Sequence, residues 1–241
     1  MYLWTPDSIR FRVDAAEYGG FDAKIAARVL RGLPESARVC DAGCGLGYLS
    51  LALSTGCESV TAVDTSAEAL AVLRQNIVRH RAFNITAVQD DLFAMRPETP
   101  YDAMVFCFFG RVGETLRAAK AQCSGQVVLI KKNWKNHRFA IEEKPLKGYT
   151  FQHTVSELDK LNLPYETATF PIEMGQPFRS LDDALLFFKT YAEESDGEVL
   201  LEQIRSRLVR TDSEHYPYYL PSYKTLGIVT LNTGDIPDSI E

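Results

Sequence analysis

Apolar and polar positions along this chain alternate with two different periods, which predict strands and helices in turn. Short uninterrupted apolar runs such as Val127-Val128-Leu129-Ile130 are typical of strands buried on both faces. Between such runs, apolar residues recur every three or four positions, as at Ile25, Val29 and Leu30, which is the spacing of an amphipathic helix. The pattern therefore predicts an α/β protein with a largely parallel sheet and helices on both of its faces.

The boundaries of these elements follow from turn residues and from the changes of period. The pattern predicts helices over residues 21–33, 48–54, 66–81, 112–122, 155–163, 181–194 and 197–209. It predicts strands or extended segments over residues 37–41, 59–64, 85–89, 101–108, 126–131, 165–172 and 225–231. No repeat or low-complexity segment interrupts this order.

Three alternate glycines follow the strand predicted at residues 37–41. The sequence reads Asp41-Ala42-Gly43-Cys44-Gly45-Leu46-Gly47 and continues into an apolar helical segment. Glycine tolerates positive φ and lets a ligand approach bare main chain, while the free N–H groups of the following helix face the same ligand. The turn therefore predicts a nucleotide or nucleoside site.

The spacing of the turn disfavours two common nucleotide-binding motifs. A phosphate-binding P-loop ends in Gly-Lys-Ser/Thr, whereas this turn ends in Gly47-Tyr48-Leu49. The dinucleotide fingerprint needs a glycine at its sixth place, which here is Tyr48 when counted from Gly43. Asp41 would oppose a pyrophosphate but suits an ammonium group, so the turn favours a cationic nucleoside without phosphate.

The glycine turn closely resembles the first motif of class I S-adenosylmethionine-dependent methyltransferases, D/E-x-G-x-G-x-G at the end of the first strand. Three later segments resemble other landmarks of this family and follow in the same order. The segment from Val60 to Asp64 resembles the strand ending at the ribose-binding acid, and Asp91 resembles the adenine-contacting acid after the third strand. The segment from Tyr101 to Gly110 resembles the fourth strand, whose end passes between cofactor and acceptor.

The resemblance implies one domain over residues 1–241, with a doubly wound, Rossmann-like sheet of seven strands and helices on both faces. Residues 21–177 would form the cofactor-binding core, and residues 223–241 the last strand and tail. Residues 178–222 would form an inserted helical cap before the last strand, with residues 1–20 as a further segment covering the substrate. A dimerisation surface is the alternative use of the inserted segment.

The same resemblance assigns residues to S-adenosylmethionine, whose product would be S-adenosylhomocysteine. The implied cofactor-binding residues are Asp41, Gly43, Cys44, Gly45, Gly47, Asp64, Thr65, Asp90, Asp91, Leu92 and Phe106. Taken singly, each acid has another explanation, because an Asp at the end of a strand commonly caps the next helix. Their order along the chain favours cofactor binding.

The sequence offers fewer candidate residues for the acceptor than for the cofactor. The candidate substrate-binding residues are Tyr18, Phe108, Phe109 and Tyr218. His153, near a helix beyond the fifth strand, is the candidate catalytic base, which the reaction needs only for a poorly ionised hydroxyl or a protonated amine. The fourth strand ends in Phe106-Cys107-Phe108-Phe109 and lacks the two prolines of the family's amino-group methyltransferases. The sequence therefore disfavours a flat exocyclic amine as acceptor.

Composition bears on location and on metal binding. The chain is 46% apolar and 24% charged, as in ordinary globular proteins. No apolar run approaches the ~20 residues of a membrane span, and the start of the sequence lacks an export signal, so we expect a cytoplasmic protein without membrane contact. The five cysteines are odd in number and lack C-x-x-C spacing, so we expect free thiols and no metal site.

Charge bears on the partner. A net charge of −6 disfavours nucleic acid. One basic cluster, Lys131-Lys132-Asn133-Trp134-Lys135-Asn136-His137-Arg138, could grip an anionic substrate or RNA, although we favour a solvated loop. The preferred function is methyl transfer to a small-molecule acceptor by a monomer or homodimer. A methyltransferase for RNA or protein and a cofactor-binding protein without transfer activity remain alternatives.

Overall fold

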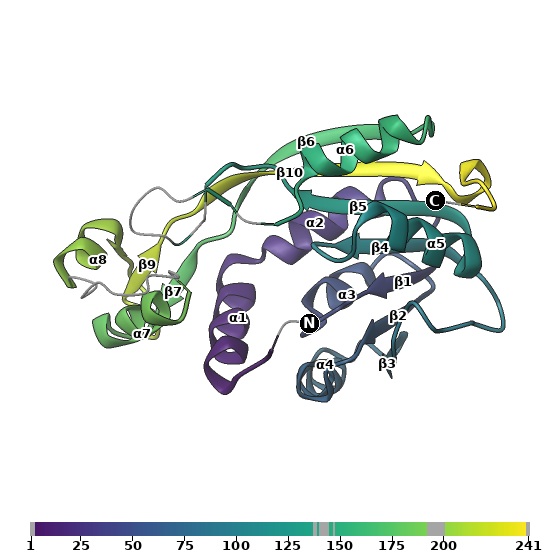
Figure 1. The fold of residues 1–241 in the computed structure, drawn as a ribbon. Coiled ribbons are helices and arrows are strands. Elements are labelled where there is room, and N and C mark those ends of the chain that lie inside the picture. Colours follow the sequence, from purple (N-terminus) through teal and green to yellow (C-terminus); the bar gives the residue numbers. More distant parts are fainter. Residues whose placement is uncertain (1–2, 137–138, 140–144, 147, 192–200, 240–241) are drawn as a thin grey trace.

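A seven-stranded mixed sheet forms the centre of the computed structural model, which describes residues 3–136, 139, 145–146, 148–191 and 201–239 (Figure 1). The strands, in spatial order, are β3 (Ile85–Gln89), β2 (Ser59–Asp64), β1 (Arg38–Ala42), β4 (Tyr101–Cys107), β5 (Cys123–Lys132), β10 (Tyr223–Asn232) and β6 (Glu166–Glu173). Only β10 runs antiparallel to its neighbours. The predicted doubly wound α/β sheet is therefore confirmed.

Helices cover both faces of this sheet, because its central strands present apolar side chains on each side. One core packs the sheet against α2 (Phe21–Leu30), α3 (Tyr48–Leu53) and α4 (Ala67–His80). The other core packs it against α5 (Val112–Gln122) and α6 (Phe151–Lys160). The helix predicted at residues 155–163 thus begins earlier, where Thr150 caps α6.

A cap stands beside the carboxyl ends of the parallel strands (Figure 1). It contains α7 (Leu181–Tyr191), α8 (Leu201–Arg207) and a small sheet of β7 (Gln176–Phe178), β9 (Tyr218–Leu220) and β8 (Val209–Arg210). Both helices fall where the sequence predicts them, although residues 192–200 between them lie outside the described part. The small sheet was not predicted, because strands of two or three residues are too short to show a period of two.

The N-terminal segment forms a helix, α1 (Pro6–Gly19), that packs onto the cap. Phe11 lies in the aromatic core of the cap, with its ring centroid 5.0 Å from that of Phe187. The buried carboxylate of Asp14 accepts hydrogen bonds from Arg179 at 2.7 Å and from the Tyr216 hydroxyl at 2.8 Å. These contacts join α1 to elements far from it in sequence.

A single residue, Gly20, separates α1 from α2. It adopts φ 58°, which ends α1 and lets α2 begin at once in a new direction. Arg12 on α1 and Asp22 on α2 lie on either side of this joint and form an ion pair of 2.6 Å. The joint and the ion pair together fix the orientation of α1 relative to α2.

Two further observations concern the chain as a whole. None of the helices in the described ranges combines the length and apolarity that a membrane span requires. The five cysteines are free thiols.

Candidate active site

The glycine turn connects β1 to α3 through three residues in the left-handed region. Gly43, Gly45 and Gly47 adopt φ values of 68°, 54° and 74°, which confirms the positive φ expected from the sequence. The Gly43 and Cys44 N–H groups donate to the carbonyl of Val63 at 2.9 and 3.0 Å. These bonds tie the turn to the end of β2.

Two aromatic rings lie against the bare main chain of this turn. A Cβ atom on Gly43 would stand 2.6 Å from the ring of Phe109, and a Cβ atom on Gly45 would stand 3.1 Å from the ring of Trp4. Both distances are shorter than ordinary packing allows, so glycine is needed for close approach as well as for φ. The turn is therefore covered by side chains from the N-terminal segment and from the loop after β4.

Asp41 is a buried carboxylate at the start of the turn. Its Oδ2 accepts a hydrogen bond of 2.5 Å from the Ser50 hydroxyl. Burial, with smaller contributions from the charges of Asp22 and Asp64, raises the pKa of Asp41 to about 7. A positive group bound beside it would favour its ionised form, which is the electrostatic property that a cationic ligand requires.

The acids at the ends of β2 and β3 lie at the same edge of the sheet as the glycine turn. Asp64 accepts hydrogen bonds from the Gly45 N–H at 2.8 Å and the Ser66 N–H at 2.9 Å, so it holds the turn in place. Asp91 accepts from the Phe93 N–H at 3.0 Å, and its own N–H donates to Asp90 at 2.7 Å. Cofactor binding by these acids, by Gly47 and by the exposed Thr65 stays a prediction.

Two of the predicted cofactor residues have side chains inside the core. Phe106 is 0% exposed and Leu92 is 3% exposed, and both belong to the cluster packed against α5 and α6. The alternation of a strand explains Phe106, because neighbouring residues of β4 point to opposite faces. Their side chains therefore fill the core, and any contact with a ligand would come from their main chain.

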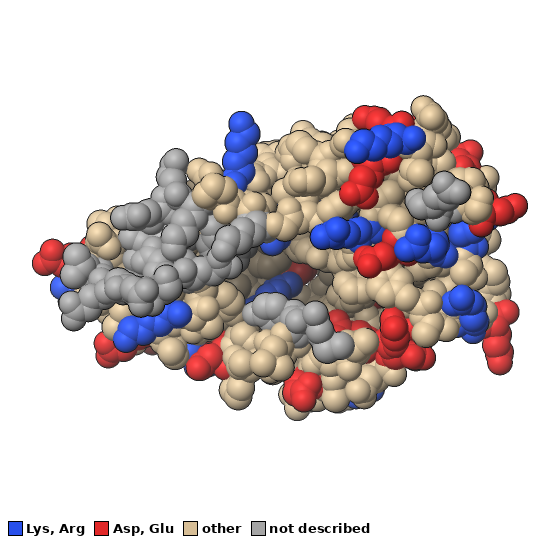
Figure 2. Space-filling model, viewed as in Figure 1, with Lys and Arg blue, Asp and Glu red and all other residues tan. Residues whose placement is uncertain are grey.

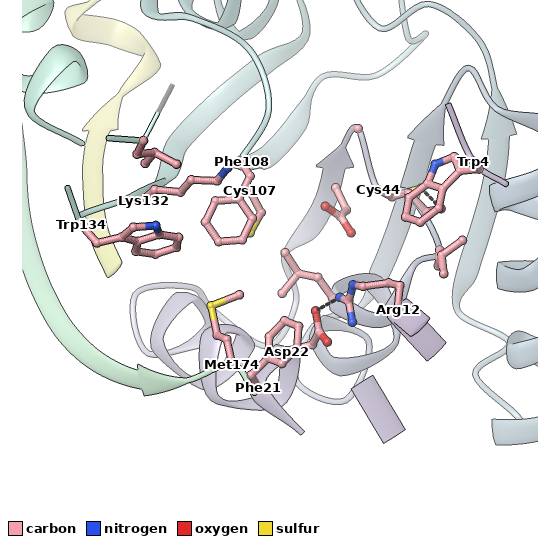
Figure 3. Close-up of a pocket in the computed structure, with 16 residues that line it drawn as sticks. Trp4, Arg12, Phe21, Asp22, Cys44, Cys107, Phe108, Lys132, Trp134 and Met174 are labelled. Carbon is pink, nitrogen blue, oxygen red and sulfur yellow. Dashed lines mark hydrogen bonds and ion pairs between the residues drawn. The ribbon is translucent and has the colours of Figure 1, made fainter. Parts of the chain in front are cut away.

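A cavity of about 350 Å³ opens beside the glycine turn (Figure 3). It is lined by the turn, by the start of α2, by α1 with the segment before it, and by the ends of the strands nearest the cap. The lining residues are Trp4, Arg12, Phe21, Asp22, Asp41, Gly43, Cys44, Gly45, Leu46, Leu49, Cys107, Phe108, Lys132, Trp134, Leu146 and Met174. The end at the glycine turn is formed by main chain and the carboxylate of Asp41, and the other end is formed by aromatic and apolar side chains such as Phe108 and Trp134.

Three residues of the lining carry buried polar atoms without a hydrogen-bond partner. They are Arg12 at Nη1, Asp22 at Oδ2 and Trp134 at Nε1. Arg12 and Asp22 already bind each other through their other atoms, and Figure 3 shows the pair between Phe21 and the glycine turn. Unsatisfied buried donors and acceptors are costly and rare in folded proteins. Three such atoms at one cavity make it the candidate ligand site.

The cavity brings together only part of the predicted site. Asp41, Gly43, Cys44, Gly45 and Phe108 line it, and Phe109 covers Gly43. The cap side of α1 holds Tyr18, whose ring centroid lies 5.6 Å from that of Tyr216. The guanidinium carbon of Arg210 lies 4.5 Å from the ring centroid of Tyr218. The structure therefore does not place Tyr18 or Tyr218 at the cavity.

His153 lies at the exposed start of α6. Its Nδ1 accepts a hydrogen bond of 3.2 Å from the N–H of Thr150, and its ring stacks on Tyr149 at 5.8 Å. It is not among the described residues that line the cavity. A catalytic role for His153 stays an untested prediction, and its contacts are those of a helix cap.

The basic cluster divides into residues with different surroundings. Lys131 is 3% exposed, so the interpretation of the cluster as a solvated loop is wrong for this residue. Its ammonium donates to the carbonyls of Phe109 at 2.6 Å and Gly110 at 2.7 Å, and burial lowers its pKa to about 8. Lys132 and Trp134 line the cavity, whereas His137 and Arg138 lie outside the described residues.

Other cavity residues were missed in the sequence because they come from distant segments. Trp4, Arg12, Asp22 and Met174 carry no motif. The one available signal was the Gly19-Gly20 pair just before the helix predicted from residue 21. That signal predicts a joint but does not indicate a cavity.

Comparison with known proteins agrees with this geometry. A family model described as "Methyltransferase domain" matches residues 39–127, which hold the glycine turn and strands β1 to β4. No curated protein sequence matches the chain. The match therefore covers the predicted cofactor side and not the cap.

Solved structures show the same fold at low sequence identity. A proposed methyltransferase from Bacillus halodurans C-125 aligns with a TM-score of 0.53 and 13% identity, over 88% of this chain and 98% of that one. A TehB-like SAM-dependent methyltransferase from Corynebacterium glutamicum aligns with a TM-score of 0.51 and 16% identity, over 93% and 95%.

The fold and the glycine turn define a Rossmann-like methyltransferase domain. Residues 39–127 match the methyltransferase family model, and the sheet has the fold of the two methyltransferase structures described above.

Proposed function

We propose that this protein transfers the methyl group of S-adenosylmethionine to a small-molecule acceptor. The observation that supports this proposal is a single cavity joining the glycine turn and Asp41 to an aromatic wall. The turn offers close approach to main chain, Asp41 offers a carboxylate for a cation, and Arg12 and Asp22 offer an unsatisfied donor and acceptor. These groups fit a ligand that carries both charges at its amino-acid end.

When bound, S-adenosylmethionine supplies a methyl group on a positively charged sulfur that departs as a neutral thioether. The residues of the chain then have to orient the acceptor and keep water away, because placement provides much of the acceleration in such a transfer. The ring of Phe108 faces the cavity, and aromatic faces attract cations. We assign Phe108 to the boundary between cofactor and acceptor.

The cavity favours an acceptor atom that is nucleophilic without a base. Among the described lining residues there is no histidine, and the carboxylates of Asp22 and Asp41 are assigned to the amino-acid end of the cofactor. Burial raises the pKa of both Cys44 and Cys107, so these thiols stay protonated. The amine of Lys132 and the guanidinium of Arg12 are cationic and serve binding better than proton removal. A carboxylate, thiolate or neutral amine fits this environment.

The size of the cavity favours a small acceptor over a macromolecule. A volume of about 350 Å³ lies at the lower end of small-molecule sites. Part of the basic cluster that could contact RNA is buried, since Lys131 bonds the loop after β4. The cluster therefore offers fewer free cations than the sequence indicates.

Two measurements test the proposal. Calorimetric titration of the wild-type protein with S-adenosylhomocysteine should show one site. Asp64→Ala should weaken the binding free energy by roughly 1–3 kcal/mol, because this carboxylate is the predicted ribose partner and also holds Gly45. The control variant is Asp212→Ala, at an exposed position in the cap. Asp102 is also exposed but accepts a hydrogen bond from the Arg38 N–H, so it is less suitable as a control.

The acceptor class is tested with radiolabelled methyl donor and cell extract separated by ultrafiltration. Label transferred to molecules in the filtrate supports a small acceptor. Label found only in the retained protein or RNA contradicts it. Absence of S-adenosylhomocysteine binding in a folded sample contradicts the whole proposal.

A further inference from the structure

A second, smaller cleft adjoins the aromatic end of the cavity. It has a volume of about 280 Å³ and is lined by Phe108, Gly110, Arg111, Glu114, Lys131, Lys132, Gly148 and Tyr149. Phe108 and Lys132 line both spaces. The cavity and the cleft therefore meet at these two side chains. Figure 2 shows a hollow between the cap and the main sheet, with Lys or Arg atoms visible inside it.

Phe108 stands at this meeting point in an unusual conformation. Its φ is 57°, in the left-handed region that bulky residues rarely adopt, and its side chain is 40% exposed. The Phe108 N–H donates to the Ile130 carbonyl at 2.9 Å, and Lys131 holds the next two carbonyls. The surrounding structure thus imposes this backbone, as is found at functional sites.

The charges around the cleft are mainly positive. Among the described lining residues, Arg111, Lys131 and Lys132 are basic and Glu114 is acidic. Glu114 accepts a hydrogen bond of 3.1 Å from the Arg111 N–H at the start of α5, and nearby Glu157 accepts from the Tyr149 hydroxyl at 2.8 Å. The charges of both carboxylates also act on Lys131 and oppose the effect of burial on its pKa. Among the described residues, three cations thus stand against two carboxylates, in a protein of net charge −6.

The adjoining wall adds a neutral donor. Trp134 lines the cavity beside Lys132, and its buried Nε1 has no partner. An indole N–H can only donate, so it needs an acceptor atom. An oxyanion on a ligand would satisfy this donor and contact the cations of the cleft, while the rings of Phe21, Phe108 and Trp134 would contact an apolar body.

We propose that the acceptor is a small molecule with an apolar, flat body and an oxyanion group, either carboxylate or phosphate. The body lies in the aromatic end of the cavity, and the oxyanion lies in the cleft with Arg111 and Lys132. This inference rests on the proposed function, because it names the substrate class of the same site. It also gives the basic cluster a role in anion binding instead of RNA binding.

The test uses two matched pairs of probes on protein saturated with S-adenosylhomocysteine. One pair is 2-naphthoate with 2-naphthamide, and the other is 2-naphthyl phosphate with 2-naphthol. Binding is measured by calorimetry or ligand-observed NMR, so no turnover is needed. We expect at least one anion to bind about tenfold or more tightly than its neutral partner. The better of the two anions identifies carboxylate or phosphate as the recognised group.

Three variants locate the anion. Lys132→Gln and Arg111→Gln should each remove most of the preference for the anion, and Trp134→Phe should reduce it by a smaller factor while keeping an aromatic ring. Lys160→Gln, at the exposed end of α6, is the matched control and should leave the preference unchanged. Circular dichroism checks that each variant is folded.

The failures are distinguishable. Equal binding of anion and neutral partner, or binding of neither probe, overturns the inference when S-adenosylhomocysteine still binds. A preference that survives in both Lys132→Gln and Arg111→Gln also overturns it. Loss of S-adenosylhomocysteine binding in the wild-type protein contradicts the proposed function instead.

Discussion

The two ends of the cavity are built in different ways. The glycine-turn end comes from one continuous stretch, residues 41–49, where β1 passes into α3. The aromatic end comes from widely separated positions, including Phe21, Phe108, Trp134 and Met174. The first end is encoded in a local motif, whereas the second exists only because the sheet and α1 bring distant residues together. Substitutions at the aromatic end can therefore leave the glycine turn unchanged.

The largest expected effect concerns the electrostatics of the glycine-turn end. The pKa of Asp41 is about 7 in the folded protein, whereas an unfolded chain has an Asp pKa near 4. The folded state therefore binds more protons between these values, and the free energy of unfolding falls as pH rises through this window. A side-chain amide in place of this carboxyl group would not titrate.

For Asp41→Asn, the free energy of unfolding relative to wild type should rise by up to ~4 kcal/mol between about pH 4 and about pH 7. Denaturant titrations across this window measure the difference. Asp90→Asn, an exposed acid at the same edge, is the control. If the difference in free energy of unfolding between Asp41→Asn and wild type does not change with pH, the pKa of Asp41 is not raised in the folded protein. The glycine-turn end would then lack the electrostatic property assigned to it.

A second prediction concerns close packing at the turn. Gly43→Ala places a Cβ 2.6 Å from the Phe109 ring on a backbone with φ 68°. We expect it to lower the free energy of unfolding by roughly 2–3 kcal/mol and to abolish measurable S-adenosylhomocysteine binding. Gly234→Ala is the matched control, because a Cβ there meets nothing within 4 Å. Unchanged binding in Gly43→Ala would contradict the assignment of this turn to the cofactor.

A third prediction concerns the loop that separates the two ends. Lys131→Met removes the ammonium that binds the carbonyls of Phe109 and Gly110 and leaves these acceptors without it. We expect a loss of about 1–2 kcal/mol in the free energy of unfolding, measured by denaturant titration. Lys160→Met, at an exposed position, should change little. Equal stability of the two variants would show that Lys131 does not hold the loop.

The smallest expected effect concerns Trp4, which belongs to the N-terminal segment but lies against Gly45. Trp4→Ala should weaken S-adenosylhomocysteine binding about three- to tenfold, equivalent to ~1 kcal/mol, without a comparable loss of stability. Leu3→Ala is the control, because Leu3 is 81% exposed. If both variants bind alike, the ring of Trp4 covers the turn without contributing to the site.

The sequence could predict the central sheet because buried parallel strands leave uninterrupted apolar runs and the glycine turn has a fixed spacing. It could not predict that the strand ending at residue 131 continues through Lys132. Lys131 reaches the carbonyls of the loop after β4, whereas Lys132 reaches the cavity, and both line the cleft beside it. Adjacent charges in the sequence thus have different partners although they share one cleft.

The N-terminal helix was missed for a related reason. The buried apolar side chains of α1 are Phe11, Ala15 and Ala16, a stripe too narrow to stand out in the sequence. Phe11 completes the core of the cap, which forms largely from residues far later in the chain. The residues that bury this side of α1 lie far from it in sequence, so a local pattern does not predict the contact.

The main sheet gives the cap a defined point of attachment. The chain leaves the sheet at Glu173 and returns at Tyr223, and these two residues pair across β6 and β10. The segment between them lies outside the main sheet and joins two strands that pair antiparallel. During evolution, this segment could be lengthened, shortened or exchanged without shifting the register of any strand that carries the glycine turn. An engineer could graft a different cap at the same pair of residues and keep the main sheet in register.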